Sequence, residues 1–216
     1  MSITDYARKM TVSLGLMLAI TTAAPLLAQT ETTAQVPGAT ATADGLNMGV
    51  VAGAPPAPKT QENAAVGETY LAASFELWEQ RCVKMEDGSD PCQLYQLLKD
   101  KDGNAVAEIN MFPLPAGSQA AAGATIVVPL ETLLTANLQL AVDTSAPRLY
   151  PFTFCAPIGC VARVGFTAEE VDQFRKGAKA TMTIVPAAAP EQRVDLDISL
   201  KGFTAGYEAV AKTMPK

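Results

Sequence analysis

The stretch LYPFTFCAPIGCVARVGF, residues 149–166, places two cysteines on either side of Ala-Pro-Ile-Gly. Its flanks are rich in the β-branched and aromatic residues that favour strands. Pro157 and Gly159 occupy the second and fourth positions of the four intervening residues, as a type I turn prefers. The stretch therefore predicts a β-hairpin in which Cys155 and Cys160 face each other. Facing Cα atoms of an antiparallel pair lie about 4.5 to 5.5 Å apart, which suits a disulfide.

The other two cysteines, Cys82 and Cys92, flank a segment with an Asp-Gly turn dipeptide at its centre, so they too can join the arms of a hairpin. A zinc site is disfavoured, because structural zinc ligands usually come in closely spaced Cys pairs. A thioredoxin-like redox motif needs C-x-x-C, which is absent. We therefore expect two structural disulfides, Cys82–Cys92 and Cys155–Cys160, although spacing alone leaves crossed pairing open.

The N-terminal segment, residues 1–28, has the features of an export signal. Arg8 and Lys9 supply a basic start, an apolar core covers 14–20, and Ala28 is a small residue suited to precede the cut. An uncleaved anchor is the alternative, although no other apolar run is long enough to span a bilayer. Cleavage near Ala28 predicts a periplasmic or secreted, cell-surface protein, in an oxidising space where disulfides persist.

The remaining chain divides into a linker and one domain. Residues 29–66 are rich in Ala, Thr, Gly and Pro and lack aromatic residues, so a disordered linker is expected there. A folded domain is expected over 67–213, where hydrophobic residues mostly alternate with polar ones, as in strands with one buried face. The clearest case is RVDLDISLK, residues 193–201. The segment 69–84 is long enough to form one bent strand or two.

Helices are few in this pattern. Thr167 and Glu170 form a capping box that begins a helix, and Gly177 follows its last turn as a C-cap. A second short helix is expected in FTAGYEAVAK, residues 203–212. With around eight strands, the sequence predicts a mainly β fold, an antiparallel β-sandwich or open barrel with one or two short helices and two disulfides.

Composition narrows the function further. The chain has 216 residues, a net charge of −6 and no histidine. The negative charge argues against nucleic-acid binding, and the lack of histidine removes the commonest general base and metal ligand. No nucleophile elbow, P-loop, dinucleotide fingerprint or EF-hand is found. We therefore expect no enzyme, no catalytic residues, no cofactor and no metal.

A few individual residues are candidates for chemistry. Trp78 shares strand parity with Cys82, which favours core packing near that disulfide over a ligand platform. Asp195 and Asp197 alternate with apolar residues, which favours a solvated sheet face over an acid pair. Arg148 and Arg163 flank the cysteine hairpin and are a weak candidate for an anion site.

A series of motifs follows in a fixed order over about residues 70–212, from WEQRC through VPLETLL, LQLAVD, YPFTFCAPIGCVARV and FRKGAKATM to DISLKGFTAGYEAV. This order resembles the invasion associated locus B family of exported bacterial proteins. Its most specific parts are the cysteine hairpin and the run that ends in Gly202 and Phe203, to which the resemblance gives a structural role. Glu131 and Thr135-Ala136 depart from the usual Gly and Pro/Gly of the family's turns. The resemblance carries no catalytic residues.

The resemblance implies an exported, disulfide-stapled β domain. We expect a binding or adaptor protein of the cell envelope, with invasion or host interaction as the associated role. Its partner is expected to be an unidentified protein or envelope component and not a nucleic acid, and the mature chain is expected to have no transmembrane domain. The alternatives are a thiol-active or other envelope enzyme and a purely structural envelope protein.

Overall fold

The computed structural model describes residues 58–214 of the chain. The predicted signal segment and the first part of the predicted linker, up to residue 57, lie outside the described residues. The described part folds into eleven strands, two α-helices and one short 3₁₀ helix, η1 (Leu134–Ala136). None of these helices is long and apolar enough to cross a membrane.

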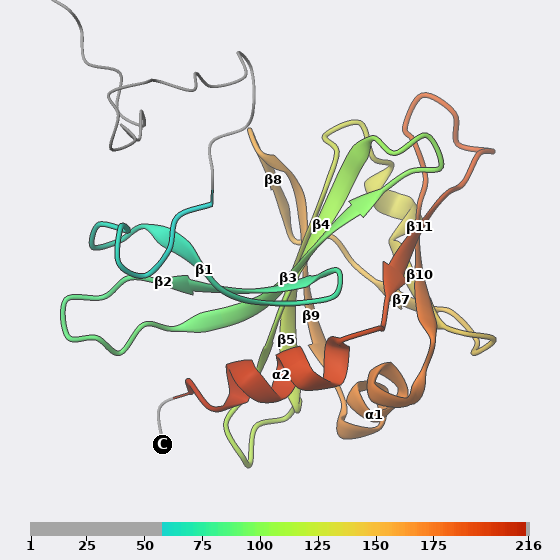
Figure 1. Cartoon of the computed structure of the whole chain (residues 1–216). Coiled ribbons are helices and arrows are strands. Elements are labelled where there is room, and N and C mark those ends of the chain that lie inside the picture. The colour runs from blue at the N-terminus through green and yellow to red at the C-terminus, as the bar shows by residue number, and fades with distance from the viewer. Residues whose placement is uncertain (1–57, 215–216) are drawn as a thin grey trace, which may run out of the picture. The chain divides into compact units, whose positions relative to one another are not determined.

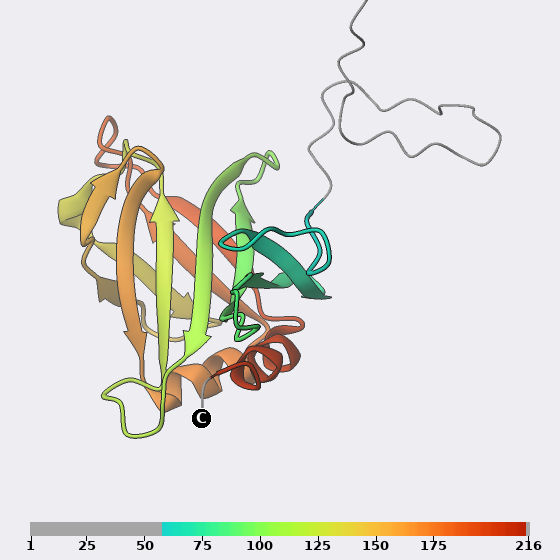
Figure 2. The same cartoon turned by 90° about the vertical axis from the view of Figure 1, so that its left-hand side faces the viewer.

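The strands form two antiparallel sheets, which confirms the predicted mainly β fold. The larger sheet contains, in spatial order, β1 (Thr69–Phe75), β2 (Trp78–Val83), β3 (Cys92–Lys99), β4 (Ala105–Pro113), β5 (Ala122–Val128), β9 (Gly159–Phe166) and β8 (Phe154–Ala156). The smaller sheet contains β11 (Val194–Ser199), β10 (Lys179–Ile184), β6 (Leu138–Val142) and β7 (Arg148–Tyr150). The sheets pack over one core, and helices α1 (Ala168–Lys176) and α2 (Phe203–Ala211) lie at the same end of them (Figures 1 and 2).

Strand alternation places the core as the sequence predicts. In β11 the side chains of Leu196 and Ile198 are buried, while those of Asp195 and Asp197 are exposed. The segment 69–84 forms two strands, because the chain turns at Glu76, where φ is 57°. The structure has eleven strands where around eight are expected, and part of the difference is β7, a three-residue strand that is too short to show a period.

An aromatic chain crosses the core between the helices and both sheets. The rings of Trp78, Phe203, Phe174, Phe166 and Tyr150 follow one another with centroids 5.3 to 5.9 Å apart. Edge-on and tilted contacts of this kind add to the free energy gained from burial alone. The chain of rings therefore fixes both helices against the sheets.

The helix signals are confirmed in detail. The Glu170 amide donates to Thr167 Oγ1 (3.2 Å) and the Thr167 amide donates to Glu170 Oε2 (2.8 Å), which completes the capping box of α1. Gly177 ends this helix in an extended conformation, where a Cβ atom would lie 2.6 Å from Val142 Cγ1. Gly202 precedes α2 with φ of 81°, and a Cβ atom there would lie 2.3 Å from the Phe75 carbonyl oxygen.

The start of the domain differs from the expected boundary at residue 67. The Leu71 amide donates to the Lys59 carbonyl (2.9 Å), and the Gln61 side chain donates to Asp90 (3.2 Å). Residues 58–66 were expected to belong to the linker because of their composition, but these hydrogen bonds tie them to the domain. Backbone pairing of this kind does not depend on apolar side chains, which is why composition gave no sign of it.

Candidate functional site

Both predicted disulfides are present, each across a facing pair of strand residues. Cys82 faces Cys92 on β2 and β3, and Cys155 faces Cys160 on β8 and β9, with Cα atoms 4.0 Å apart in each pair. No cysteine is free in the described residues, which contain all four cysteines of the chain. The bridges therefore act as staples of the two hairpins, and no thiol is available for chemistry.

The β8–β9 hairpin holds its turn close to the neighbouring strand β5. Gly159 has φ of 139°, and a Cβ atom there would lie 2.4 Å from the Val128 carbonyl oxygen. Only glycine fits this approach. The turn between Pro157 and Gly159 leaves the side chain of Ile158 76% exposed.

Four exposed apolar side chains gather around this hairpin, and we call them the hairpin patch: Leu97, Leu130, Phe154 and Ile158, each between 43% and 76% exposed. The strand register aligns Leu97, Glu108, Val127, Val161 and Phe154 in one row across the outer face of the large sheet. A hollow of about 370 Å³ between Leu97, Val127 and Ile158 lies within the patch. No helix covers this face of β4, β5 and β9 in Figure 2.

A polar row runs beside the patch on the same face of the large sheet. It consists of Glu79, Tyr95, Asn110, Thr125 and Arg163, which the register places opposite one another. The guanidinium of a further residue, Arg81, stacks 3.2 Å from the centroid of the Tyr95 ring and pairs with Glu79. The outer face thus combines an apolar area with a polar border.

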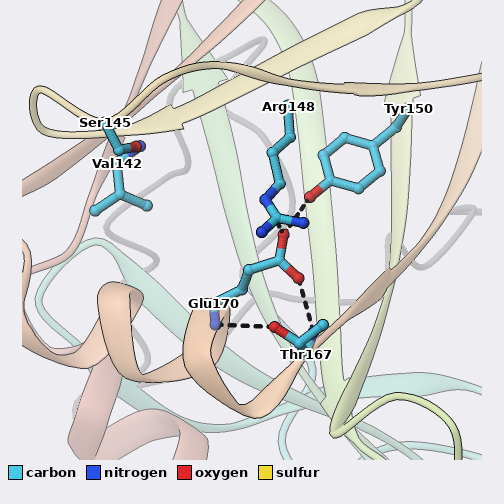
Figure 3. A network of polar contacts seen from close by, with 6 residues as sticks. All are labelled: Val142, Ser145, Arg148, Tyr150, Thr167 and Glu170. Atoms are coloured by element: carbon cyan, nitrogen blue, oxygen red, sulfur yellow. Dashed lines mark hydrogen bonds and ion pairs between the residues drawn. The ribbon is translucent and has the colours of Figure 1, made fainter.

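A second candidate site is a cavity of about 280 Å³ bordered by β6, β7 and helix α1. Figure 3 shows Glu170 rising from α1 toward Arg148 and Tyr150, which descend from β7. The Tyr150 hydroxyl donates to Glu170 Oε1 (2.8 Å), and Arg148 Nε lies 3.0 Å from the same oxygen. Burial, followed by the hydrogen bond to Glu170, raises the pKa of Tyr150 above its ordinary value.

A third polar cluster anchors the turn between β2 and β3. The Tyr70 hydroxyl (2.7 Å) and the Met85 amide (2.8 Å) donate to the Asp90 carboxylate. The Met85 amide, and then Tyr70, lower the pKa of Asp90 to about 2. Burial, and then Asp90, raise the pKa of Tyr70 to about 12. The ionised Asp90 carboxylate and the protonated Tyr70 hydroxyl are the forms that make this hydrogen bond.

The remaining candidates have structural positions. Trp78 is fully buried, and its Nε1 donates to the Ser199 carbonyl (2.7 Å), so it is not exposed as a ligand platform. Arg148 and Arg163 do not form a common anion site, because one pairs with Glu170 and the other lies over the Phe154 ring. Asp197 pairs with Lys179 on the solvated sheet face. Within residues 58–214, no group of three or more acidic or cysteine side chains is arranged to hold a metal ion.

Two features of the candidate sites were not predicted from the sequence. The hairpin patch depends on Leu97, which reaches the hairpin only through the register of β3, β4, β5 and β9. The cavity depends on the pairing of β6 with β7, which carries Arg148 and Tyr150 to α1. The one local signal was the capping box, which marked Glu170 as a helix residue but not as a partner of Arg148.

Comparisons with known proteins agree with this architecture. The family model described as invasion associated locus B protein matches residues 78–211. Invasion protein B homologs from two strains of Brucella abortus are 25% identical over 144 residues, which cover 67% of this chain and 81% of each relative. Their names are those of invasion proteins and not of enzymes. The crystal structure of invasion associated protein b from Bartonella henselae shares the fold, with a TM-score of 0.56 and 20% identity over 66% of this chain and 96% of that one. This chain belongs to the invasion associated locus B family.

Proposed function

We propose that this protein is a non-enzymatic binding module of the bacterial cell envelope, which docks a protein partner on the hairpin patch. The export signal predicted at residues 1–28 supports an envelope or cell-surface location. The names of the Brucella abortus and Bartonella henselae relatives associate those proteins with invasion, and we extend this association to the present chain as part of the proposal.

The exposed hairpin patch is the observation that carries the proposal. Contiguous exposed apolar side chains with a polar border are typical of protein interaction sites. Here Ile158 projects from a hairpin that the Cys155–Cys160 disulfide and the Gly159 turn hold in place. Because this anchor is already ordered, binding would cost little conformational entropy.

The arrangement of the titratable side chains gives less support to an enzymatic function. The described titratable side chains with the clearest pKa shifts, Tyr70, Asp90 and Tyr150, are each engaged in a hydrogen bond that joins two elements of the fold. Shifted pKa values also arise in structural networks, so these groups do not by themselves indicate catalysis.

A photo-cross-linking experiment in cells tests the proposal. A photoreactive amino acid replaces Ile158 in one variant and Ser118, an exposed residue of the β4–β5 loop at the other end of the large sheet, in a matched control. We expect a discrete adduct with one envelope protein from position 158 that is absent from position 118. The adduct formed from a probe at Leu130 should disappear when Ile158→Asp is added. Equal labelling at both positions, or an adduct insensitive to Ile158→Asp, would overturn the assignment of the patch.

A further inference from the structure

The cavity bordered by β6, β7 and α1 combines an apolar interior with a polar opening. Its apolar wall includes the buried side chains of Leu140, Val142, Phe166 and Phe174. The volume of about 280 Å³ is close to the lower end of the range of small-molecule pockets, roughly 300 to 1,000 Å³. In Figure 3, Val142 and Ser145 lie on one side of this space, while Arg148 and Glu170 lie on the other.

The acidic side chain of the cavity, Glu170, already has its partners within the protein. The buried Glu170 carboxylate receives hydrogen bonds from the Tyr150 hydroxyl and the Thr167 amide and is paired with Arg148 Nε. These contacts fix the Arg148 guanidinium beside the carboxylate. Glu170 therefore acts as a positioning residue for Arg148.

The polar groups that remain at the cavity include several hydrogen-bond donors. Within residues 58–214, the Arg148 Nη groups, the Gln173 side-chain amide and the Ser145 hydroxyl donate to no protein acceptor. Arg148 is also the one basic residue that lines this cavity. A ligand that carries hydrogen-bond acceptors and negative charge would match these donors, and a planar carboxylate suits the fork of a guanidinium.

The neighbouring hollow shows where such a ligand's charged end would not lie. That hollow, of about 490 Å³, is lined by Asp143, Glu169 and Asp172 with a single basic side chain, Lys176. Asp143 accepts backbone hydrogen bonds from Ala178 and Lys179, and Asp172 pairs with Arg175. Its net negative charge would repel a carboxylate and favour placement of that group on the Arg148 side.

We propose that this cavity binds a small amphipathic carboxylate. The carboxylate is held by the Arg148 Nη groups, and a short apolar chain or ring lies against Leu140, Val142 and the two phenylalanines. The proposal is independent of the hairpin patch, because no hairpin-patch residue lines this cavity. A fatty acid and an aryl-alkanoic acid share the required chemistry, and the test distinguishes them.

The test titrates the full disulfide-bonded chain with octanoate and with 3-phenylpropanoate, by calorimetry and by ¹⁵N NMR. We expect saturable binding of at least one carboxylate, with shifts at Ser145, Arg148 and Gln173 but not at Ile158. The stronger ligand shows whether the site prefers a chain or a ring. Octanol and octylamine should bind at least about tenfold more weakly, since they lack the charge that Arg148 recognises. Equal binding of octanol, or no saturable binding of either carboxylate, would overturn the proposal.

Two pairs of variants locate the bound carboxylate. Arg148→Gln should weaken binding about tenfold or more, while Arg163→Gln, another exposed arginine, should leave it unchanged. Ala146 is an exposed residue that lines the cavity, so the large ring introduced by Ala146→Trp should block entry of the ligand. Its control, Ala188→Trp, lies in a loop that does not line the cavity. If Arg148→Gln fails to fold, the Ala146→Trp pair decides, and undiminished binding in Ala146→Trp would refute the site.

Discussion

The buried side chain of Gln96 joins the two sheets at one residue. It lies on β3, is 2% exposed, and its amide donates to the Ser199 carbonyl (3.0 Å) and accepts from the Ser199 amide (2.9 Å). Ser199 ends β11, an edge strand of the smaller sheet, so the glutamine takes the place of a neighbouring strand at that point. Trp78 Nε1 donates to the same carbonyl (2.7 Å). The arrangement satisfies backbone groups that burial would otherwise leave unpaired.

Replacement of this side chain tests its role. Gln96→Leu preserves the approximate size but leaves the Ser199 amide without its acceptor, so we expect the free energy of unfolding to fall by about 1 to 3 kcal/mol. Gln93→Leu, on the partly exposed outer face of the same strand, is the matched control and should change stability by less than about 0.5 kcal/mol. Urea unfolding followed by the fluorescence of Trp78 measures both. Equal effects of the two substitutions would show that the bridge contributes nothing specific.

The hairpins are the elements that local chemistry explains best. In both, facing cysteines close the strand ends, and the turn between β2 and β3 has a further clamp in Asp90. The carboxyl group of Asp90 accepts hydrogen bonds from the Met85 amide and the Tyr70 hydroxyl, and these bonds are strongest while it is ionised. The β2–β3 turn is therefore an element whose stability depends on pH.

The depressed pKa of Asp90, about 2, sets the sign and the window of this dependence. Its ordinary value is about 3.8, so the stabilisation is fully present above that pH and is lost as the pH falls through about 2. Asp90→Asn should lower the thermal midpoint at neutral pH and make its decline across this acidic window shallower than in the natural chain. Asp102→Asn, in the exposed β3–β4 turn, is the control. Parallel pH profiles for Asp90→Asn and the natural chain would contradict the role of Asp90.

Across the whole molecule, the sequence predicted correctly those contacts that join residues close together in the chain. The Thr167–Glu170 box and the Cys155–Cys160 hairpin involve residues three and five positions apart, and both have the predicted form. The contacts that create the cavity site and that join the two sheets link distant positions. Arg148 meets Glu170, and Gln96 meets Ser199 at a separation of 103 residues, so these depend on strand order and register. Alternation specifies which face of a strand is buried but not which strand lies beside it.

The N-terminal boundary of the domain was likewise not predictable from sequence pattern. Composition predicted a linker through residue 66, yet Lys59 and Gln61 contact the domain through backbone and amide groups. Hydrogen bonds from polar, exposed segments leave no hydrophobic period in the sequence. The family match, which covers residues 78–211, likewise begins after this segment.

The last prediction concerns the full chain and is the removal of its N-terminal segment on export. We expect the protein recovered from the cell envelope to begin near Gln29, because the apolar core at residues 14–20 would direct export and Ala28 would precede the cut. Non-reducing peptide mapping should then find both disulfides, since only export exposes the thiols to an oxidising space. Leu16→Arg, which interrupts the apolar core, should retain the precursor with reduced cysteines, whereas Thr32→Arg beyond the cut should be processed normally. An envelope pool that still begins at Met1 would instead identify the segment as an anchor.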